Sequence, residues 1–183
     1  MPVTTLDPHT ALIVVDLQKG IASYVPERPF AQLLERNQAL LAAFRARHLP
    51  VALVNVSGMA PGRNELPVGG TPPAGWDELL PELNAQPGDI RVTKYTWGAF
   101  VRTGLEQRLR ALGVTQVVVT GVATSIGVES TARQAYELGF NVTLAIDAMA
   151  DLSPDAHDRS IRLIFPRLGE TGSTQDIINL LGA

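Results

Sequence analysis

The sequence predicts an α/β protein with three layers, in which helices cover both faces of a mostly parallel sheet of about six strands. Short apolar runs rich in Val, Ile and Leu alternate with segments of helical periodicity, the order expected of parallel strands joined by helices. Several runs are almost continuously apolar, as strands buried on both faces are. The chain has 183 residues, a length typical of one domain, so we expect a single domain over residues 1–183.

Five apolar runs are the expected strands, and a weaker signal near the C-terminus predicts a short sixth one. The three runs that are richest in Val, Ile, Leu and Ala are the first, the fourth and the fifth, which predicts parallel strands that are covered on both faces. The runs cover residues 11–17, 51–56, 90–93, 116–120 and 141–148, and the weak signal covers 169–171.

Helical signals fill most of the intervals between these runs. Gly139 is placed to end the third helix as its C-terminal glycine. Ser153 is placed to cap the fourth, with proline at the first helical position, and Ser173 or Thr174 to cap the last. The first four helical segments are 30–44, 103–112, 125–138 and 153–168, and the last carries apolar residues from 177 to 181.

Residues 57–89 interrupt this rhythm with a long connection that contains six prolines and Trp76. A loop of this length in a compact domain is usually functional or disordered. The proline and tryptophan content favours an ordered flap, and a disordered insert is the alternative.

The composition excludes several classes of function. The chain has no cysteine, so it has no disulfide, thiol nucleophile or cysteine-bound metal. Its 15 basic residues are scattered among 18 acidic ones, for a net charge of −3, which argues against nucleic acid as a partner. The N-terminus lacks a basic and apolar leader and no apolar run approaches membrane length, so we expect a cytoplasmic protein without membrane contact.

Cofactor and metal signatures are absent as well. The sequence contains no Gly-x-Gly-x-x-Gly, no P-loop and no Gly-x-Ser-x-Gly, so dinucleotide, nucleotide and α/β-hydrolase functions lack their motifs. The three histidines, His9, His48 and His157, are far apart without metal-ligand spacing, and we expect each to be a surface or structural residue. We therefore expect neither a cofactor nor a metal.

Ligands of an open parallel sheet bind at the carboxyl ends of the strands, and three features follow expected strands there. These are Asp16, Lys94 and the turn 121–127. Each alone has a structural explanation: a turn cap, a solvated lysine and a connection into a helix. If their strands are neighbours, a carboxylate, an ammonium and helix N-terminal amides meet in one crevice. Trp97 and Phe100 would line it, or belong to the core.

The segments around these residues resemble those of the isochorismatase-like, or cysteine hydrolase, superfamily. They are Ala-Leu-Ile-Val-Val-Asp16-Leu-Gln18, Lys94-Tyr-Thr-Trp97-Gly-Ala-Phe100 and Gly121-Val-Ala123-Thr124-Ser-Ile-Gly127-Val-Glu-Ser-Thr-Ala-Arg133. The resemblance covers nearly the whole chain. It implies a parallel sheet flanked by helices, catalytic roles for Asp16 and Lys94, and a cis peptide between Val122 and Ala123.

One position departs from the amidases that this chain resembles. Gly127 stands where they carry the nucleophilic cysteine, so no thioester can form. Ser125, two residues away, is expected to cap the helix. The segment after the second strand also lacks the Asp-x-His metal cluster of nicotinamidases.

The isochorismatases of the superfamily also carry glycine at this position and cleave a vinyl ether with an aspartic acid as proton donor. That resemblance implies that Asp16 is the general acid, that Lys94 orients it or the substrate, and that Gly127 leaves room for a ligand. Isochorismate-cleaving members place tyrosine where this chain has Ala123, so isochorismate itself is not implied. The expected substrate contacts are Gln18, Trp97, Phe100, Ala123 and Thr124.

The leading hypothesis is therefore a hydrolase of the isochorismatase family that acts without a cysteine nucleophile on a small, anionic metabolite, with Asp16 as general acid or base. A catalytically silent member that binds a ligand or serves as a scaffold is the main alternative. A cofactor-using oxidoreductase on the same topology is a third. We also expect a homo-oligomer, because apolar content is high and members of the superfamily are commonly oligomeric.

Overall fold

A computed structural model describes residues 2–25, 27–65 and 71–182 of the chain. Its centre is a sheet of six parallel strands in the order β3-β2-β1-β4-β5-β6. This confirms the predicted fold class, including the short sixth strand. The strands are β1 (Thr10–Val15), β2 (Val51–Val56), β3 (Ile90–Lys94), β4 (Gln116–Val122), β5 (Asn141–Ala150) and β6 (Glu170–Gly172).

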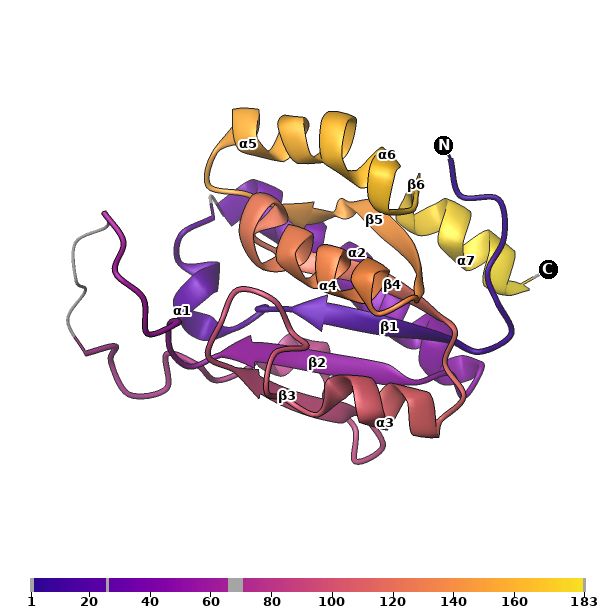
Figure 1. Cartoon of the computed structure of the whole chain (residues 1–183), viewed down its shortest axis with the longest axis horizontal. Helices are drawn as coiled ribbons and strands as arrows, with labels where there is room; N and C mark the ends of the chain where they lie inside the picture. Colours follow the sequence, from indigo (N-terminus) through magenta and orange to yellow (C-terminus); the bar gives the residue numbers. More distant parts are fainter. Residues whose placement is uncertain (1, 26, 66–70, 183) are drawn as a thin grey trace.

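Helices cover both faces of the sheet, as Figure 1 shows, with α3 and α4 in front and α2 behind. Two groups of buried apolar side chains, one on each face, form the core. β1 is buried along its whole length because it lies between the helical layers and between two strands. The helices are α1 (Lys19–Ala22), α2 (Glu27–Ala46), α3 (Leu105–Ala111), α4 (Glu129–Glu137), α5 (Pro154–Arg159), α6 (Phe165–Leu168) and α7 (Thr174–Gly182), with short turns η1 (Pro81–Leu83), η2 (Thr124–Val128) and η3 (Ser160–Ile164).

The direction in which the chain adds strands reverses between β1 and β4. After β1 the chain builds β2 and β3 on one side, then returns to place β4 on the other side. Val15 and Gly121 lie opposite each other at this junction. A Cβ at Gly121, whose φ is +117°, would lie 2.0 Å from the carbonyl oxygen of Val15, so only glycine fits. The reversal marks the carboxyl ends of β1 and β4 as the expected ligand site.

Several predicted helix ends are confirmed by their hydrogen bonds. The Ser153 hydroxyl accepts a hydrogen bond from the Ala156 amide at 3.3 Å. The Ser173 hydroxyl accepts one from the backbone amide of Asp176 at 3.1 Å. Gly139 follows α4 with φ +79°. Two segments differ from the predicted α-helices, because η2 and η3 have π-helical geometry. The one-turn helix α1 was not predicted.

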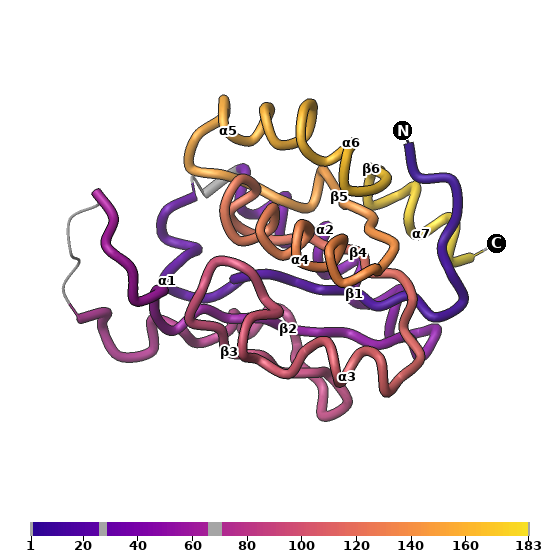
Figure 2. Tube along the Cα trace, viewed as in Figure 1, coloured from indigo at the N-terminus to yellow at the C-terminus, as the bar shows by residue number. Residues whose placement is uncertain are grey.

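The end of the long connection between β2 and β3 is joined to α2 and to the segment that follows β1. Leu79 pairs with Gln18 in an isolated bridge, and the Asp89 carboxylate accepts a hydrogen bond from Arg45 at 2.6 Å. Figure 2 shows the earlier part of the connection extending from the side on which β1 and β2 end. Residues 57–65 and 71–89 of this connection are described, and residues 66–70 lie outside the described ranges; the ordered flap stays a prediction. Within those ranges, no helix has the length and apolar character to cross a membrane.

Candidate active site

Asp16 and Lys94 form a buried ion pair at the carboxyl edge of the sheet. Asp16 follows β1 and Lys94 ends β3, so the lysine side chain crosses the end of β2, which lies between them. Lys94 Nζ lies 2.7 Å from Asp16 Oδ2, and the two side chains are 2% and 7% exposed. Lys94 Nζ also donates a hydrogen bond to the Thr96 carbonyl at 3.2 Å. The structure thus brings together two of the three predicted catalytic residues.

Burial dominates the electrostatics of Asp16. Removal from water raises the pKa of the Asp16 carboxyl from 3.8 to about 6, although the charge and hydrogen bond of Lys94 pull it down. The folded protein thus holds this proton more tightly than the unfolded chain does. Ionising Asp16 therefore destabilises the fold as the pH rises from about 4 to about 6. Such a perturbed carboxyl in a protein is a candidate for proton transfer.

The second oxygen of Asp16 is unusual among the described residues. Asp16 Oδ1 is a buried side-chain atom that accepts no hydrogen bond there. A buried oxygen left without a partner typically costs about 1–3 kcal/mol. The Asp16 backbone holds the group in place, because its amide donates to the Val54 carbonyl at 2.8 Å and its φ of 53° lies in the left-handed region. The unpaired oxygen is therefore a feature of an ordered site.

Gly127 faces the same carboxylate from the other half of the sheet. A Cβ at this glycine would lie 3.2 Å from Asp16 Oδ2 and 3.1 Å from Cγ1 of Val15. Both separations are shorter than ordinary van der Waals contact. The position is thus adjacent to Asp16, as predicted, and the glycine allows the carboxylate to come close. The peptide between Val122 and Ala123, at the start of this turn, is cis, as the resemblance implied.

Gln18 has a structural role in the described protein. Its amide nitrogen donates to the carbonyls of Val56 at 3.0 Å and Trp76 at 3.3 Å. Its amide oxygen accepts from the Val56 amide at 2.7 Å. Gln18 is fully buried and joins the end of β2 to the connection that follows it. A substrate contact for Gln18 stays a prediction.

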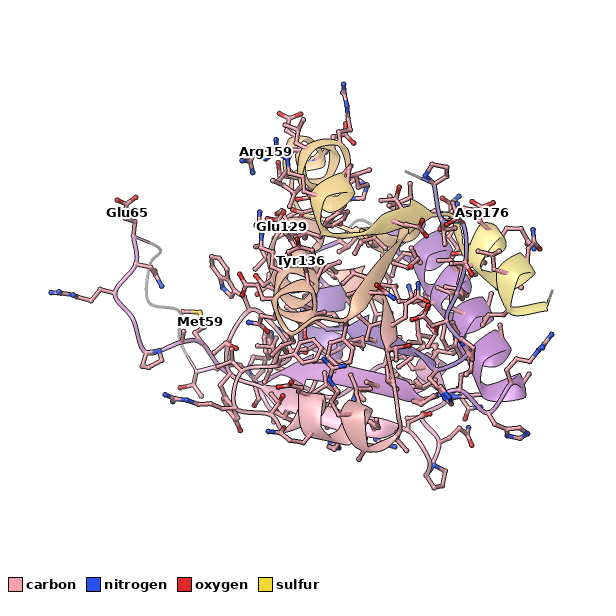
Figure 3. The ribbon with its side chains drawn as sticks, turned by 45° about the vertical axis from the view of Figure 1, so that its right-hand side comes forward. Met59, Glu65, Glu129, Tyr136, Arg159 and Asp176 are labelled. Carbon is pink, nitrogen blue, oxygen red and sulfur yellow. The ribbon has the colours of Figure 1, made fainter. Side chains whose placement is uncertain are left out.

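Trp97 and Phe100 follow Lys94 but have different surroundings. Phe100 packs on Phe140, with ring centroids 5.9 Å apart, at the margin of the core. Trp97 is 62% exposed and lines a cavity of about 380 Å³ beside the residues that follow β2. The other lining residues are Met59, Ala60, Gly62, Arg63 and Asn64. Figure 3 shows Met59 and Glu65 on this projecting segment.

The turn after β4 is held by partners that sequence reasoning missed. Ser125 was expected to cap the helix, but the structure contradicts this: η2 begins at Thr124 without a side-chain cap. The Ser125 amide instead donates to Asp151 Oδ2 at 2.7 Å. The buried Thr124 hydroxyl lies 2.8 Å from His157 Nδ1. Both partners come from the chain after β5, and their separation in sequence gave no signal for these contacts.

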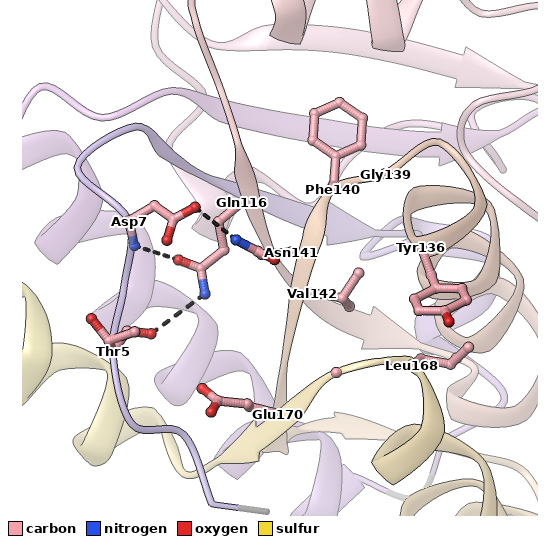
Figure 4. Close-up of a pocket in the computed structure, with 11 residues that line it drawn as sticks. Thr5, Asp7, Gln116, Tyr136, Gly139, Phe140, Asn141, Val142, Leu168 and Glu170 are labelled. Atoms are coloured by element: carbon pink, nitrogen blue, oxygen red, sulfur yellow. Dashed lines mark hydrogen bonds between the residues drawn. The ribbon is translucent and has the colours of Figure 1, made fainter.

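A second cavity lies at the opposite, amino edge of the sheet and is shown in Figure 4. It has a volume of about 440 Å³. Its polar groups already bond to one another: Gln116 Oε1 accepts from the Asp7 amide at 2.5 Å, and Asn141 Nδ2 donates to Asp7 Oδ2 at 3.0 Å. We therefore place the candidate site at the carboxyl edge. Among the described residues no group of three or more His, Cys, Asp or Glu could hold a metal ion.

Comparison with known proteins identifies the family and the fold. The family model "Isochorismatase domain" matches residues 10–176. The uncharacterized isochorismatase family protein YwoC of Bacillus subtilis is 40% identical over 92% of each chain. The ureidoacrylate amidohydrolase RutB of Variovorax paradoxus is 36% identical, over 78% of this chain and 69% of its own. A solved isochorismatase family protein from Burkholderia thailandensis superposes with a TM-score of 0.92 at 39% identity, over 98% of both chains.

Proposed function

The chain belongs to the isochorismatase family, and from this premise we propose that it hydrolyses a small metabolite with Asp16 as the proton-transferring group and without a cysteine nucleophile. Family relatives include named amidohydrolases. The chain has the ion pair of Asp16 and Lys94, but it has glycine at position 127 and no cysteine. A reaction at this site therefore relies on the carboxyl group.

The observation that carries the proposal is the unpaired Oδ1 of Asp16. Lys94 engages Oδ2, which leaves Oδ1 to exchange a hydrogen bond or a proton with a substrate. A pKa of about 6 keeps a fraction of the carboxyl protonated near neutral pH. An ordinary aspartic acid, with its pKa near 3.9, would be protonated in a far smaller fraction of the molecules at that pH.

The residues present can complete a hydrolysis without a covalent intermediate. The protonated Asp16 gives its proton to the substrate and becomes a carboxylate, which Lys94 stabilises through its ammonium at 2.7 Å. One water then adds to the activated carbon, and the proton that this water loses returns to Asp16. In the resulting adduct the bond from this carbon to the ether oxygen or amide nitrogen breaks, a hydroxyl proton of the adduct passes to that atom, and an alcohol or amine leaves while a carbonyl group remains. Gly127 places no side chain between the carboxyl group and the substrate. Positioned proton transfer of this kind typically accelerates a reaction about 10²–10⁴-fold.

The chemistry of the carboxyl edge supports a small anionic substrate. The cavity beside Trp97 has about 380 Å³, within the range of small-molecule sites. Its lining does not include the catalytic candidates, so a substrate held there has to extend from it to Asp16. Arg63 is the cationic residue in its lining. Because the Lys94 ammonium is engaged by Asp16 and the Thr96 carbonyl, we assign the anionic end of the substrate to Arg63 and one of its planar or apolar parts to Trp97.

The test is a substrate screen of vinyl ethers, amides and imides of small acids, with ureidoacrylate as one amide because of the RutB relatives. Wild type and Asp16→Asn are compared, with calorimetry for binding and product analysis for turnover. Multiple turnover by the wild type and its loss in Asp16→Asn support the proposal. Equal turnover in both proteins contradicts it. Tight binding without products assigns the chain to the alternative, a silent ligand-binding member.

A further inference from the structure

The segment between β3 and α3, residues 95–104, is held on α4 by two side chains of that helix. The Ala99 amide donates to Thr131 Oγ1 at 3.1 Å. The next amide, that of Phe100, donates to Gln134 Oε1 at 3.0 Å. Thr131 and Gln134 are three positions apart, so they lie on the same face of α4. Gly98 completes the contact, because a Cβ there would lie 2.3 Å from Gln134 Oε1.

Hydrogen bonds connect both partners of this contact, α4 and the segment 95–104, to the candidate site. On the helix side, Thr131 Oγ1 donates to the Gly127 carbonyl at 2.7 Å, and Gly127 faces Asp16. On the segment side, the Thr96 carbonyl accepts the hydrogen bond of the Lys94 ammonium at 3.2 Å. The same few residues thus connect Lys94 to the turn that carries Gly127.

A local explanation accounts for only part of this arrangement. Buried threonines in helices commonly donate to the carbonyl four residues before them, and the Thr131 bond to Gly127 is of this kind. The Ala99 and Phe100 amides are not local partners, since they lie 32 and 34 positions from the side chains that accept their bonds. Thr131 is fully buried, so losing its hydroxyl would leave the Ala99 amide without this acceptor in a buried place.

We propose that Thr131 and Gln134 are positioning residues that fix residues 95–104 on α4 and thereby hold the Lys94 ammonium against the Asp16 carboxylate. This inference rests on the proposed function for its catalytic meaning. The hydrogen bonds from which it is argued are those of the ligand-free protein. When the contact is weakened, the Thr96 carbonyl loses its fixed place and Lys94 loses one of its two oxygen partners. The ammonium then stabilises ionised Asp16 less well.

The test measures the pKa of Asp16 directly, by NMR titration of carboxyl-labelled aspartate in the ligand-free protein, with the Asp16→Asn spectrum to assign the signal. Thr131→Val removes the hydroxyl and keeps the shape, while Thr131→Ser keeps the hydroxyl. Gln134→Met removes the amide oxygen that accepts from Phe100, at a residue that is half-buried. We expect the pKa to rise by about 0.5 or more in Thr131→Val and in Gln134→Met, and to keep the wild-type value in Thr131→Ser.

Thr143→Val is the matched control, since Thr143 is equally buried and its hydroxyl accepts a hydrogen bond from Gln116 at 3.0 Å, far from the site. It should lower Tm without changing the Asp16 pKa. If Thr131→Val does not fold, Gln134→Met decides the question. A wild-type pKa of Asp16 in the folded variants, with only a lower Tm, would overturn the proposal. A failed substrate screen would leave this result intact, so the two proposals fail separately.

Discussion

Two buried side chains at opposite edges of the sheet, Gln116 and Asp16, differ in how their polar atoms are hydrogen-bonded. At the amino edge, Gln116 is 4% exposed. Its amide makes four hydrogen bonds: its oxygen accepts from Asp7 and Thr10, and its nitrogen donates to Thr5 and Thr143. At the carboxyl edge, Asp16 is 5% exposed, and its Oδ1 lacks a partner among the described residues. The amino edge has a well-defined cavity (Figure 4).

This difference distinguishes the amino edge from the edge at which we propose the active site. Buried polar groups in native proteins are nearly always hydrogen-bonded, and the amino edge follows that rule. A buried group that breaks this rule calls for an explanation, and an unpaired carboxylate oxygen is a stronger candidate for ligand contact than a cavity lined by groups that are already hydrogen-bonded. The cavity at the amino edge is lined by groups that already stabilise the fold.

The largest expected effect separates two aspartates, one at each edge. Asp16→Asn should lower kcat/KM by about 100-fold or more, because the variant cannot hold the transferable proton. Asp7→Asn, whose parent carboxylate accepts bonds from Thr115 and Asn141, should keep wild-type kcat/KM. Steady-state kinetics on the substrate found in the screen, with thermal melts to show folding, checks both. A comparable loss in Asp7→Asn would remove the distinction between the edges.

The pH dependence of the reaction tells a general acid from a general base. Burial raises the pKa of Asp16 to about 6. An acid must be protonated, so kcat/KM should fall about tenfold for every pH unit above about 6. The measurement is a pH profile from 4.5 to about 8.5 in buffers of constant ionic strength. A rise of kcat/KM through the same region would assign Asp16 as a base.

Gln116→Leu should show its effect in stability. The variant leaves the Asp7 amide and the Thr143 hydroxyl without their partner, and we expect a loss of about 2–4 kcal/mol in the free energy of unfolding. Urea denaturation followed by circular dichroism measures it. Activity per folded molecule should stay at the wild-type level, and a specific loss of kcat would contradict a purely structural amino edge.

A single methyl group at Gly127 should have the smallest effect. Its Cβ would lie 3.1 Å from Val15 Cγ1 and 3.2 Å from Asp16 Oδ2, so these groups must move by a few tenths of an ångström. We expect Gly127→Ala to lose about 1–2 kcal/mol of stability and some activity. Gly88→Ala, where a Cβ meets nothing within 4 Å, is the control and should retain both. Equal melting curves for the two variants would show that the site adapts freely.

The sequence predicted that the candidate residues follow strands, but it did not predict the order of those strands in the sheet. Asp16 and Lys94 end runs that read as strands, and ligands bind at the carboxyl ends of parallel strands. Gly127 follows a third run. Apolar runs along the chain were therefore sufficient to place these residues at strand ends, but the meeting of Asp16 and Lys94 across β2 comes from the strand order of the structure. The chemical identity of the site came from motifs that resemble a known family, and the family is confirmed by the comparisons.

Contacts between distant side chains could not be predicted in the same way. Gln18 reaches the backbone of Val56, 38 residues away, and Thr124 meets His157, 33 residues away. Periodicity places a residue on a face or at an edge, but it does not select which amide a side chain bonds across that distance. The unpaired Oδ1 of Asp16 is likewise a property of packing, since a lone aspartate in the sequence gives no measure of its burial.

The placement of β1 between β2 and β4 has a consequence for synthesis of the chain. Thr10 on β1 and Gln116 on β4 are 106 positions apart. A nascent or truncated chain that ends before β4 already contains Asp16 and Lys94, yet one side of its most apolar strand is open to pairing with another chain. Docking of β4 beside β1 therefore closes the open side of β1 and brings the turn with Gly127 to the proposed site.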